Sequence, residues 1–163
     1  MRKKERFVLG KRTFRSQKSK HFVLRIIYTW FFNELKANGG KWDMIGMSLY
    51  PYWTMLEHKE YTADRTITEC IANINSVARK YNCNVMVVET GMECADDKGN
   101  LASASVLAEG KRQLARVLKE CKENTDGRCK GVFYWEPECR PNQYRLGAFT
   151  EDGRPTVIMD AFK

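Results

Sequence analysis

Short runs of mostly apolar residues mark three positions along the chain where a buried β-strand is expected. The runs fall at residues 44–50, 85–89 and 131–136. Each is shorter than an ordinary helix, and Pro, Gly, Asn or Asp residues lie close to its ends. Consecutive apolar residues of this kind predict strands that are covered on both faces, as parallel strands in α/β proteins usually are.

Around these runs, apolar residues recur every three or four positions, which is typical of amphipathic helices. The expected helices cover about residues 25–38, 66–81, 102–122 and 155–162. Thr66 and Glu69 fit a capping box at the start of the second helix. The segment from Trp53 to Thr62 is polar and is expected to be a loop.

The alternation of helices and strands predicts an α/β fold with parallel strands and crossover helices. Because the carboxyl ends of parallel strands meet at one edge, the residues that end the three runs should lie together. These residues are Ser48, Tyr50, Glu89, Tyr134, Trp135 and Glu136. A cleft with a carboxylate and several aromatic rings suits a sugar, since aromatic faces stack on pyranose rings.

Glu89 is the strongest candidate for chemistry, because it ends the second run just before Gly91. Burying an unpaired carboxylate is costly, so this side chain should either have a dedicated partner or face a cleft. It is therefore a candidate catalytic or binding group on chemical grounds alone. The alternative is a solvated Glu at a strand end.

Charge is unevenly distributed along the 163 residues. The net charge is +8, but residues 1–25 hold ten Lys/Arg and one Glu, whereas the rest hold 18 Lys/Arg and 19 Asp/Glu. The basic character therefore belongs to a tail, which is expected to be disordered and to precede one domain at residues 26–163. Polyanion binding through the tail is the alternative, with nucleic acid not favoured. No apolar run is long enough to span a bilayer, so no membrane partner is expected.

Three strings resemble, in order and spacing, the C-terminal part of glycoside hydrolase family 53, the arabinogalactan endo-β-1,4-galactanases. They run from Trp42 to Trp53, from Val85 to Gly91 and from Gly131 to Pro137, and the ending from Leu146 to Phe162 is similar as well. The resemblance covers about residues 28–162. It implies a (β/α)8 TIM barrel, of which this chain would hold strands six to eight with their helices.

The resemblance also implies a set of site residues for retaining cleavage of β-1,4-galactan or arabinogalactan. Glu89 would be the nucleophile, and Trp135 would stack on a galactose ring, although Trp135 and Tyr134 could instead be core residues. Glu136 would contact the substrate or be held structurally by barrel neighbours. The other implied substrate contacts are Ser48, Tyr50, Tyr52 and Trp53. One of the two tyrosines is expected to steer the carboxylate, and the sequence does not choose between them.

The second catalytic carboxyl of this family comes from an Asn-Glu pair at the end of strand four, and no such segment is recognisable here. Asn33-Glu34 lies inside an expected helix. Retaining hydrolysis needs two carboxyls about 5–5.5 Å apart. The chain is therefore expected to be a truncated or misassembled gene product that lacks the general acid and is inactive alone. Strands six and eight would have open edges, which favour self-association.

Two other functions remain open, namely a non-catalytic galactan-binding fragment and polyanion binding by the tail. No cofactor is expected. Calcium is known in a late barrel loop of some relatives, but Glu93, Asp96 and Asp97 are a weak ligand set, so no metal site is expected.

The resemblance implies an extracellular or periplasmic location, although the basic N-terminus lacks the apolar core of a signal peptide. Disulfides are plausible by analogy with secreted proteins. The pairings considered are Cys121–Cys129 and Cys94–Cys139. Cys70 and Cys83 are expected to be buried thiols.

Overall fold

The structure is a computed structural model that describes residues 20–163, with side chains from residue 27 onward. Most of the predicted disordered tail, and the polyanion-binding hypothesis with it, falls on residues that lie outside the described ones. The elements in chain order are α1 (Lys20–Ala37), β1 (Met44–Leu49), α2 (Pro51–Glu57), α3 (Ala63–Tyr81), β2 (Asn84–Thr90), α4 (Ala104–Glu123), β3 (Cys129–Tyr134) and the 3-10 helix η1 (Val157–Phe162). None of the described helices combines the length and apolar character that crossing a bilayer requires.

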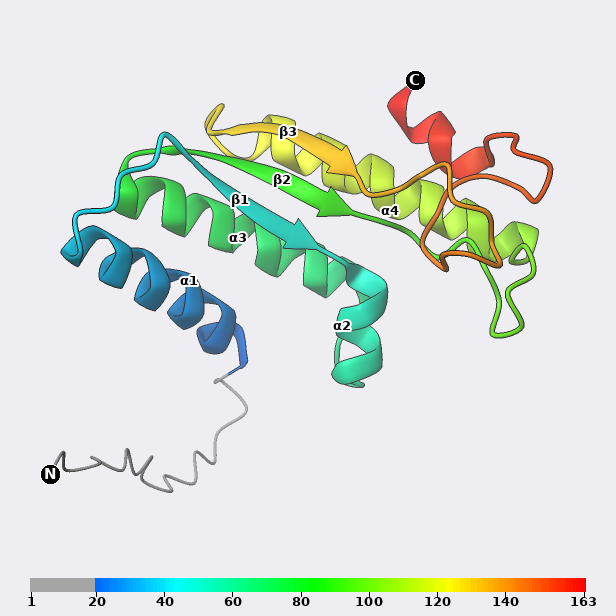
Figure 1. The fold of residues 1–163 in the computed structure, drawn as a ribbon, viewed down its shortest axis with the longest axis horizontal. Coiled ribbons are helices and arrows are strands. Elements are labelled where there is room, and N and C mark those ends of the chain that lie inside the picture. The colour runs from blue at the N-terminus through cyan, green and yellow to red at the C-terminus, as the bar shows by residue number, and fades with distance from the viewer. Residues whose placement is uncertain (1–19) are drawn as a thin grey trace, which may run out of the picture.

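The three strands form one parallel sheet in the order β1-β2-β3, which confirms the predicted parallel α/β arrangement. Figure 1 shows the three arrowheads at the same end of the sheet, next to α2 and the loops that follow β2 and β3. The residues that end the strands therefore lie along one edge, as the alternation of elements predicted.

Helices α3 and α4 pack on one face of the sheet, and alternate strand residues point into this layer. In β1, buried residues alternate with exposed ones along the whole strand. The core joins this face to the apolar stripes of α3 and α4, through Ile45, Met47, Val85, Val87, Ile67, Ile74, Val77, Leu114 and Val117. Each of these side chains is at most 2% exposed.

Four boundaries differ from the sequence prediction. Helix α1 begins at Lys20, five residues earlier than expected. The expected polar loop contains α2, which Pro51 starts at a position where its fixed φ suits a first helical turn. The last helix is 3-10 rather than α, and it begins at Val157.

The fourth difference concerns the start of α3. Its N-cap is Thr62, whose side chain accepts a hydrogen bond from the Arg65 N–H, so the predicted capping box at Thr66 is wrong. Thr66 is buried inside the first turn, and its hydroxyl donates to the Thr62 carbonyl. A threonine facing the core cannot cap the helix, because its hydroxyl is turned away from the free N–H groups.

All six cysteines are free thiols, so neither hypothetical disulfide is present. The Cys94 thiol donates to the Phe149 carbonyl, whereas Cys139 donates to the Glu136 carboxylate. Cys121 and Cys129 do approach each other, and the hydrogen bond from Cys121 lowers the pKa of the Cys129 thiol. Cys83 is buried as predicted.

Candidate active site at the strand ends

An irregularity in strand pairing determines where Glu89 points. Val85 and Val87 are buried against the helices, and strict alternation would send Glu89 to the same side. The register between β1 and β2 shifts after Met47, so that Ser48 pairs with Glu89. This bulge inserts one extra residue in β2 and turns the carboxylate to the face that no described helix covers.

Two hydroxyl groups from the neighbouring segment hold the Glu89 carboxylate. The Ser48 hydroxyl donates to Oε2 at 3.1 Å, and the Tyr50 hydroxyl donates to the same oxygen at 3.4 Å. The buried Thr90 hydroxyl donates to the Leu49 carbonyl at 2.7 Å, which locks the two strand ends together. Of the two tyrosines that the sequence left open, Tyr50 is the one that contacts Glu89.

Tyr50 is also connected to Tyr144, a residue that sequence reasoning missed. Burial raises the pKa of Tyr50, and its contacts with Tyr144 and Glu89 raise it further, so the phenol stays protonated and able to donate. Burial raises the pKa of Tyr144 as well, while its polar contacts with Tyr50 and Trp53 act in the opposite direction. Tyr144 lies in an irregular loop, where no periodicity could have drawn attention to it.

The end of β3 places Tyr134 and Trp135 in different environments. The Tyr134 hydroxyl donates to the Gly147 carbonyl and accepts from the Met92 N–H. This side chain therefore connects the loop after β2 to the loop after β3. Trp135 is 44% exposed, which rules out the core alternative for it within this structure. Glu136 is exposed and has a φ of 45°, a conformation uncommon for a residue with a side chain.

Tyr52 contacts Trp53 and Arg145 rather than Glu89. Its ring stacks edge-on against Trp53 with a centroid distance of 4.8 Å, and the Arg145 guanidinium lies 4.8 Å from its centroid. Arg145 also forms ion pairs with Glu93 and Asp97 in the loop after β2. This arginine, also missed from sequence, joins three segments at the strand ends.

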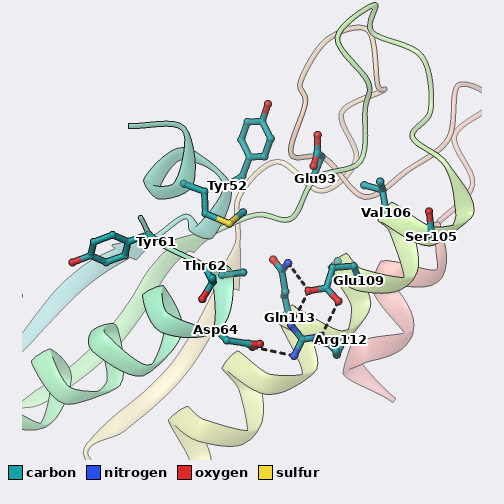
Figure 2. A pocket seen from close by; sticks show the side chains of 13 residues that line it. Tyr52, Tyr61, Thr62, Asp64, Glu93, Ser105, Val106, Glu109, Arg112 and Gln113 are labelled. Atoms are coloured by element: carbon teal, nitrogen blue, oxygen red, sulfur yellow. Dashed lines mark hydrogen bonds and ion pairs between the residues drawn. The ribbon is translucent and has the colours of Figure 1, made fainter. Parts of the chain in front are cut away.

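Two cavities flank this region. A cavity of about 240 Å³ has Ser48, Tyr50 and Trp53 in its wall. A larger one of about 470 Å³ lies between the N-terminal parts of α3 and α4 (Figure 2). Glu89 does not line the larger cavity. Charged residues that line the larger cavity pair with one another, since Arg112 forms ion pairs with both Asp64 and Glu109.

The residues weighed as calcium ligands have partners within the protein. Asp96 accepts hydrogen bonds from the Lys98 and Asn100 N–H groups, and Glu93 and Asp97 pair with Arg145. Within the part of the chain that the structure describes, no three His, Cys, Asp or Glu side chains form a group able to hold a metal ion.

Solved structures with a similar arrangement are galactanases and a relative of the same family. The GH53 catalytic domain of Ignisphaera aggregans aligns with a TM-score of 0.64 at 18% identity, covering 86% of this chain and 44% of that one. A fungal β-1,4-galactanase aligns with a TM-score of 0.60 at 20% identity, covering 83% and 43%. These neighbours imply a (β/α)8 barrel, and the parallel sheet of three strands with its helices is consistent with a portion of one.

Curated relatives give the same picture from sequence. The endo-β-1,4-galactanase of Bacillus subtilis is 29% identical over 146 residues, which are 83% of this chain and 31% of that protein. The arabinogalactan endo-β-1,4-galactanase of Cellvibrio japonicus is 30% identical over 118 residues, 66% of this chain and 29% of that protein. The chain thus spans about a third of the length of these relatives. The sequence profile of Glycosyl hydrolase family 53 matches residues 24–156, and the chain therefore belongs to that family.

Proposed function

We propose that this chain carries the nucleophile of a retaining hydrolase of β-1,4-galactan, and that Glu89 is this nucleophile. The observation that carries the proposal is the position of Glu89 at a strand end. A bulge turns it to the face of the sheet opposite α3 and α4, here called the open face, and Ser48 and Tyr50 hold it there. The relatives named as galactanases indicate the substrate class.

In the proposed reaction, a Glu89 oxygen attacks the anomeric carbon of a galactose unit while the bond to the leaving oxygen breaks. A covalent glycosyl-enzyme forms, and water later hydrolyses it. The hydrogen bonds from Ser48 and Tyr50 converge on Oε2 and fix the plane of the carboxylate, which leaves Oε1 to attack. Donors of this kind are most effective when they are in place before the reaction begins.

The exposed indole of Trp135 would supply the stacking surface for the sugar. Its backbone N–H donates to the Thr90 carbonyl at 2.8 Å, so the segment after β3 is attached directly to the strand that bears Glu89. An aromatic face suits the apolar face of galactose and also shields the reacting bond from water.

The proposed reaction also needs a group that donates a proton to the leaving oxygen, and we assign no residue of this chain to that role. Nothing in the sequence matches the Asn-Glu pair that supplies it in this family, and general acid catalysis contributes about 10²–10⁴-fold. We therefore expect the chain alone to release no oligosaccharides from galactan at a useful rate.

An activated inhibitor can test the nucleophile without a general acid. A 2,4-dinitrophenyl 2-deoxy-2-fluoro-β-galactoside has a leaving group that departs without protonation, and its fluorine slows hydrolysis of the covalent product. We expect peptide mass spectrometry to find the fluorosugar on Glu89, slowly but specifically. Glu89→Gln should abolish labelling, and Glu123→Gln, which changes an exposed carboxylate at the C-terminal end of α4, should not. Labelling of another residue, or equal labelling of Glu89→Gln, contradicts the proposal.

A non-catalytic galactan binder is the second candidate, favoured by the exposed Trp135 beside a site that lacks a recognisable acid. Electrophoresis in gels containing β-1,4-galactan would detect it as a retarded band that Trp135→Ala restores to normal mobility. Retardation without any labelling of Glu89 would favour this function over the hydrolase.

A further inference from the structure

The loops that follow β2 and β3 meet near the arrowhead end of the sheet (Figure 1), and the Arg145 side chain joins them. Its Nη2 donates to the Glu93 carboxylate at 2.7 Å, and its Nη1 donates to the Asp97 carboxylate at 2.8 Å. Because the guanidinium is planar, two carboxylates on different nitrogens fix its orientation. The side chains of Arg145 and Glu93 are 22% and 33% exposed, so water screens this pair less than a fully solvated one.

The backbone of Arg145 is attached to the same loop. Its carbonyl oxygen accepts hydrogen bonds from the Cys94 N–H at 2.9 Å and from the Ala95 N–H at 3.1 Å. Cys94 and Ala95 are both buried, so water does not compete for these two bonds. We call the contacts of Arg145 with residues 93–97 the arginine clamp. Through it, one residue of the loop after β3 fixes the start of the loop after β2.

The residue after Arg145 packs directly against the strand end that bears Glu89. Leu146 is fully buried. A Cβ atom on Gly91 would meet Leu146 at 2.9 Å and the Tyr50 ring at 3.4 Å, so the backbone here is close to both residues. Tyr50 in turn donates to the Glu89 carboxylate. The position of Leu146 therefore limits where Gly91 and the Tyr50 ring can lie.

Two further contacts connect this segment to the part of the chain that contains Tyr50. Burial raises the pKa of the Tyr50 phenol, and a polar contact with Tyr144, the residue before Arg145, raises it further. The Arg145 guanidinium also lies 4.8 Å from the centroid of the Tyr52 ring, on α2. This contact uses the face of the ring rather than its hydroxyl. Since Tyr50 is the N-cap of α2, Arg145 also contacts the helix that Tyr50 begins.

Stability alone is a poor explanation for the arginine clamp. The Arg145 Nε is buried and has no hydrogen-bond partner among the described residues. A buried donor without a partner is unfavourable, and partly buried ion pairs often add little net stability. The Asp97 side chain is 93% exposed, so its pair contributes little either. What the clamp provides is a fixed geometry, because hydrogen bonds of both the side chain and the backbone of one residue reach the same loop.

We propose that Arg145 is a positioning residue for Glu89. The arginine clamp holds residues 144–146 against Gly91 and the Tyr50 ring, and so keeps the Tyr50 hydroxyl directed at the Glu89 carboxylate. That this orientation serves a nucleophilic attack rests on the proposed function. Orientation affects the reaction more than the binding of the sugar, so loss of the clamp should lower the maximal labelling rate without a matching loss of affinity.

The test uses Arg145→Met, which retains the apolar length of the side chain but removes both ion pairs. We expect the maximal rate of Glu89 labelling by the fluorosugar to fall about tenfold, and the concentration that gives half of this rate to change less than about twofold. Arg145→Lys retains the charge but not the planar pair of donors, so it should restore the rate only in part. Arg154→Met is the matched control and should leave the rate unchanged, because Arg154 is 81% exposed and pairs with Asp152 within its own loop.

A spectroscopic measurement examines the carboxylate without any reaction. The Glu89 carboxyl carbon is assigned in the carbon-13 NMR spectrum as the carboxylate resonance that Glu89→Gln removes. We expect Arg145→Met to shift this resonance and Arg154→Met to leave it in place, since only the first alters the hydrogen bond from Tyr50. Thermal denaturation establishes that each variant is folded. Glu93→Gln, which weakens the clamp from the other loop, takes the place of Arg145→Met if that variant does not fold.

An unchanged carboxyl resonance in the folded clamp variant overturns the proposal, as does an unchanged rate of Glu89 labelling. Equal effects of Arg145→Met and Arg154→Met overturn it too, because the loss would then reflect general loosening of the loop after β3. A different outcome separates the two proposals. If the unaltered chain is not labelled at Glu89 but the resonance still shifts in Arg145→Met, the proposed function fails and the positioning of the carboxylate stands.

Discussion

The face of the sheet that packs on α3 and α4 and the face that bears Glu89 are built from alternate residues of the same strands. Val87 is fully buried, while its neighbour Val88 is 39% exposed. The covered face has a continuous apolar core with both helices, whereas the open face has large apolar side chains in water. The comparison shows that, within the described residues, one face of the sheet has a layer of helices packed against it, whereas the face that bears Glu89 does not.

The largest loss of stability should come from truncating a side chain that is buried between the helices and the sheet. Ile74 is fully buried between α3 and the sheet, so Ile74→Ala is expected to lower the free energy of unfolding by about 2–5 kcal/mol. Urea denaturation followed by circular dichroism measures the change. Met44→Ala, a truncation on the open face, is the control and should cost much less.

At the Glu89 end, the expected effect is on reactivity rather than stability. Tyr50→Phe removes a hydrogen-bond donor to the Glu89 carboxylate. A hydrogen bond to a charged group contributes about 1.5–3 kcal/mol, so the rate of fluorosugar labelling should fall by about tenfold or more. Tyr52→Phe should leave the rate unchanged, because Tyr52 contacts Arg145 and Trp53 instead. Equal effects of the two variants on the labelling rate would contradict a role for Tyr50 in holding Glu89.

The N-cap of α3 is expected to stabilise the layer of helices that covers the sheet. Thr62→Ala deletes the N-cap hydrogen bond to Arg65 and should cost about 1 kcal/mol of stability. Thr62→Asp keeps a capping oxygen and should restore most of the loss in thermal denaturation. A failure of Asp to rescue would show that Thr62 acts through packing rather than capping.

Ion pairs between α3 and α4 are expected to make a smaller contribution to stability that depends on pH. The hydrogen bonds from Arg112 and Arg116 hold the pKa of Asp64 below its usual range. A lowered folded-state pKa means that the stabilisation is present above the unfolded value and is lost as pH falls through the folded one. Because the pair is exposed, Asp64→Asn should cost only about 0.5 kcal/mol at pH 7, and the cost measured by urea denaturation should shrink as the pH is lowered toward 2. An equal loss at both pH values would contradict an ionic origin.

The smallest effect is expected on the open face of the isolated chain. Val88→Ser exchanges one solvated side chain for another and should change the free energy of unfolding by less than about 0.5 kcal/mol. Val87→Ser, one residue earlier, should be severely destabilising, because it puts a hydroxyl into the core. Similar losses for the two variants would mean that the open face is covered in solution.

Apolar periodicity predicted all three strands, the three long helices and the parallel order, because each strand and helix must bury its apolar side against a neighbour. The same reasoning missed α2, since a short helix at a strand end is stabilised by Pro51 and local hydrogen bonds rather than by an apolar stripe. It also missed Tyr144 and Arg145, whose roles depend on contacts between segments far apart in the sequence.

The sequence by itself determined that a carboxylate ends the second strand, and the motifs around it indicated the family. Only the tertiary structure decided which way that carboxylate points. With a side-chain period of two, Glu89 would follow Val85 and Val87 into the helix layer. The shift in register between β1 and β2 turns it to the other side, because a bulge depends on the pairing of two strands and leaves no mark in the alternation of either one.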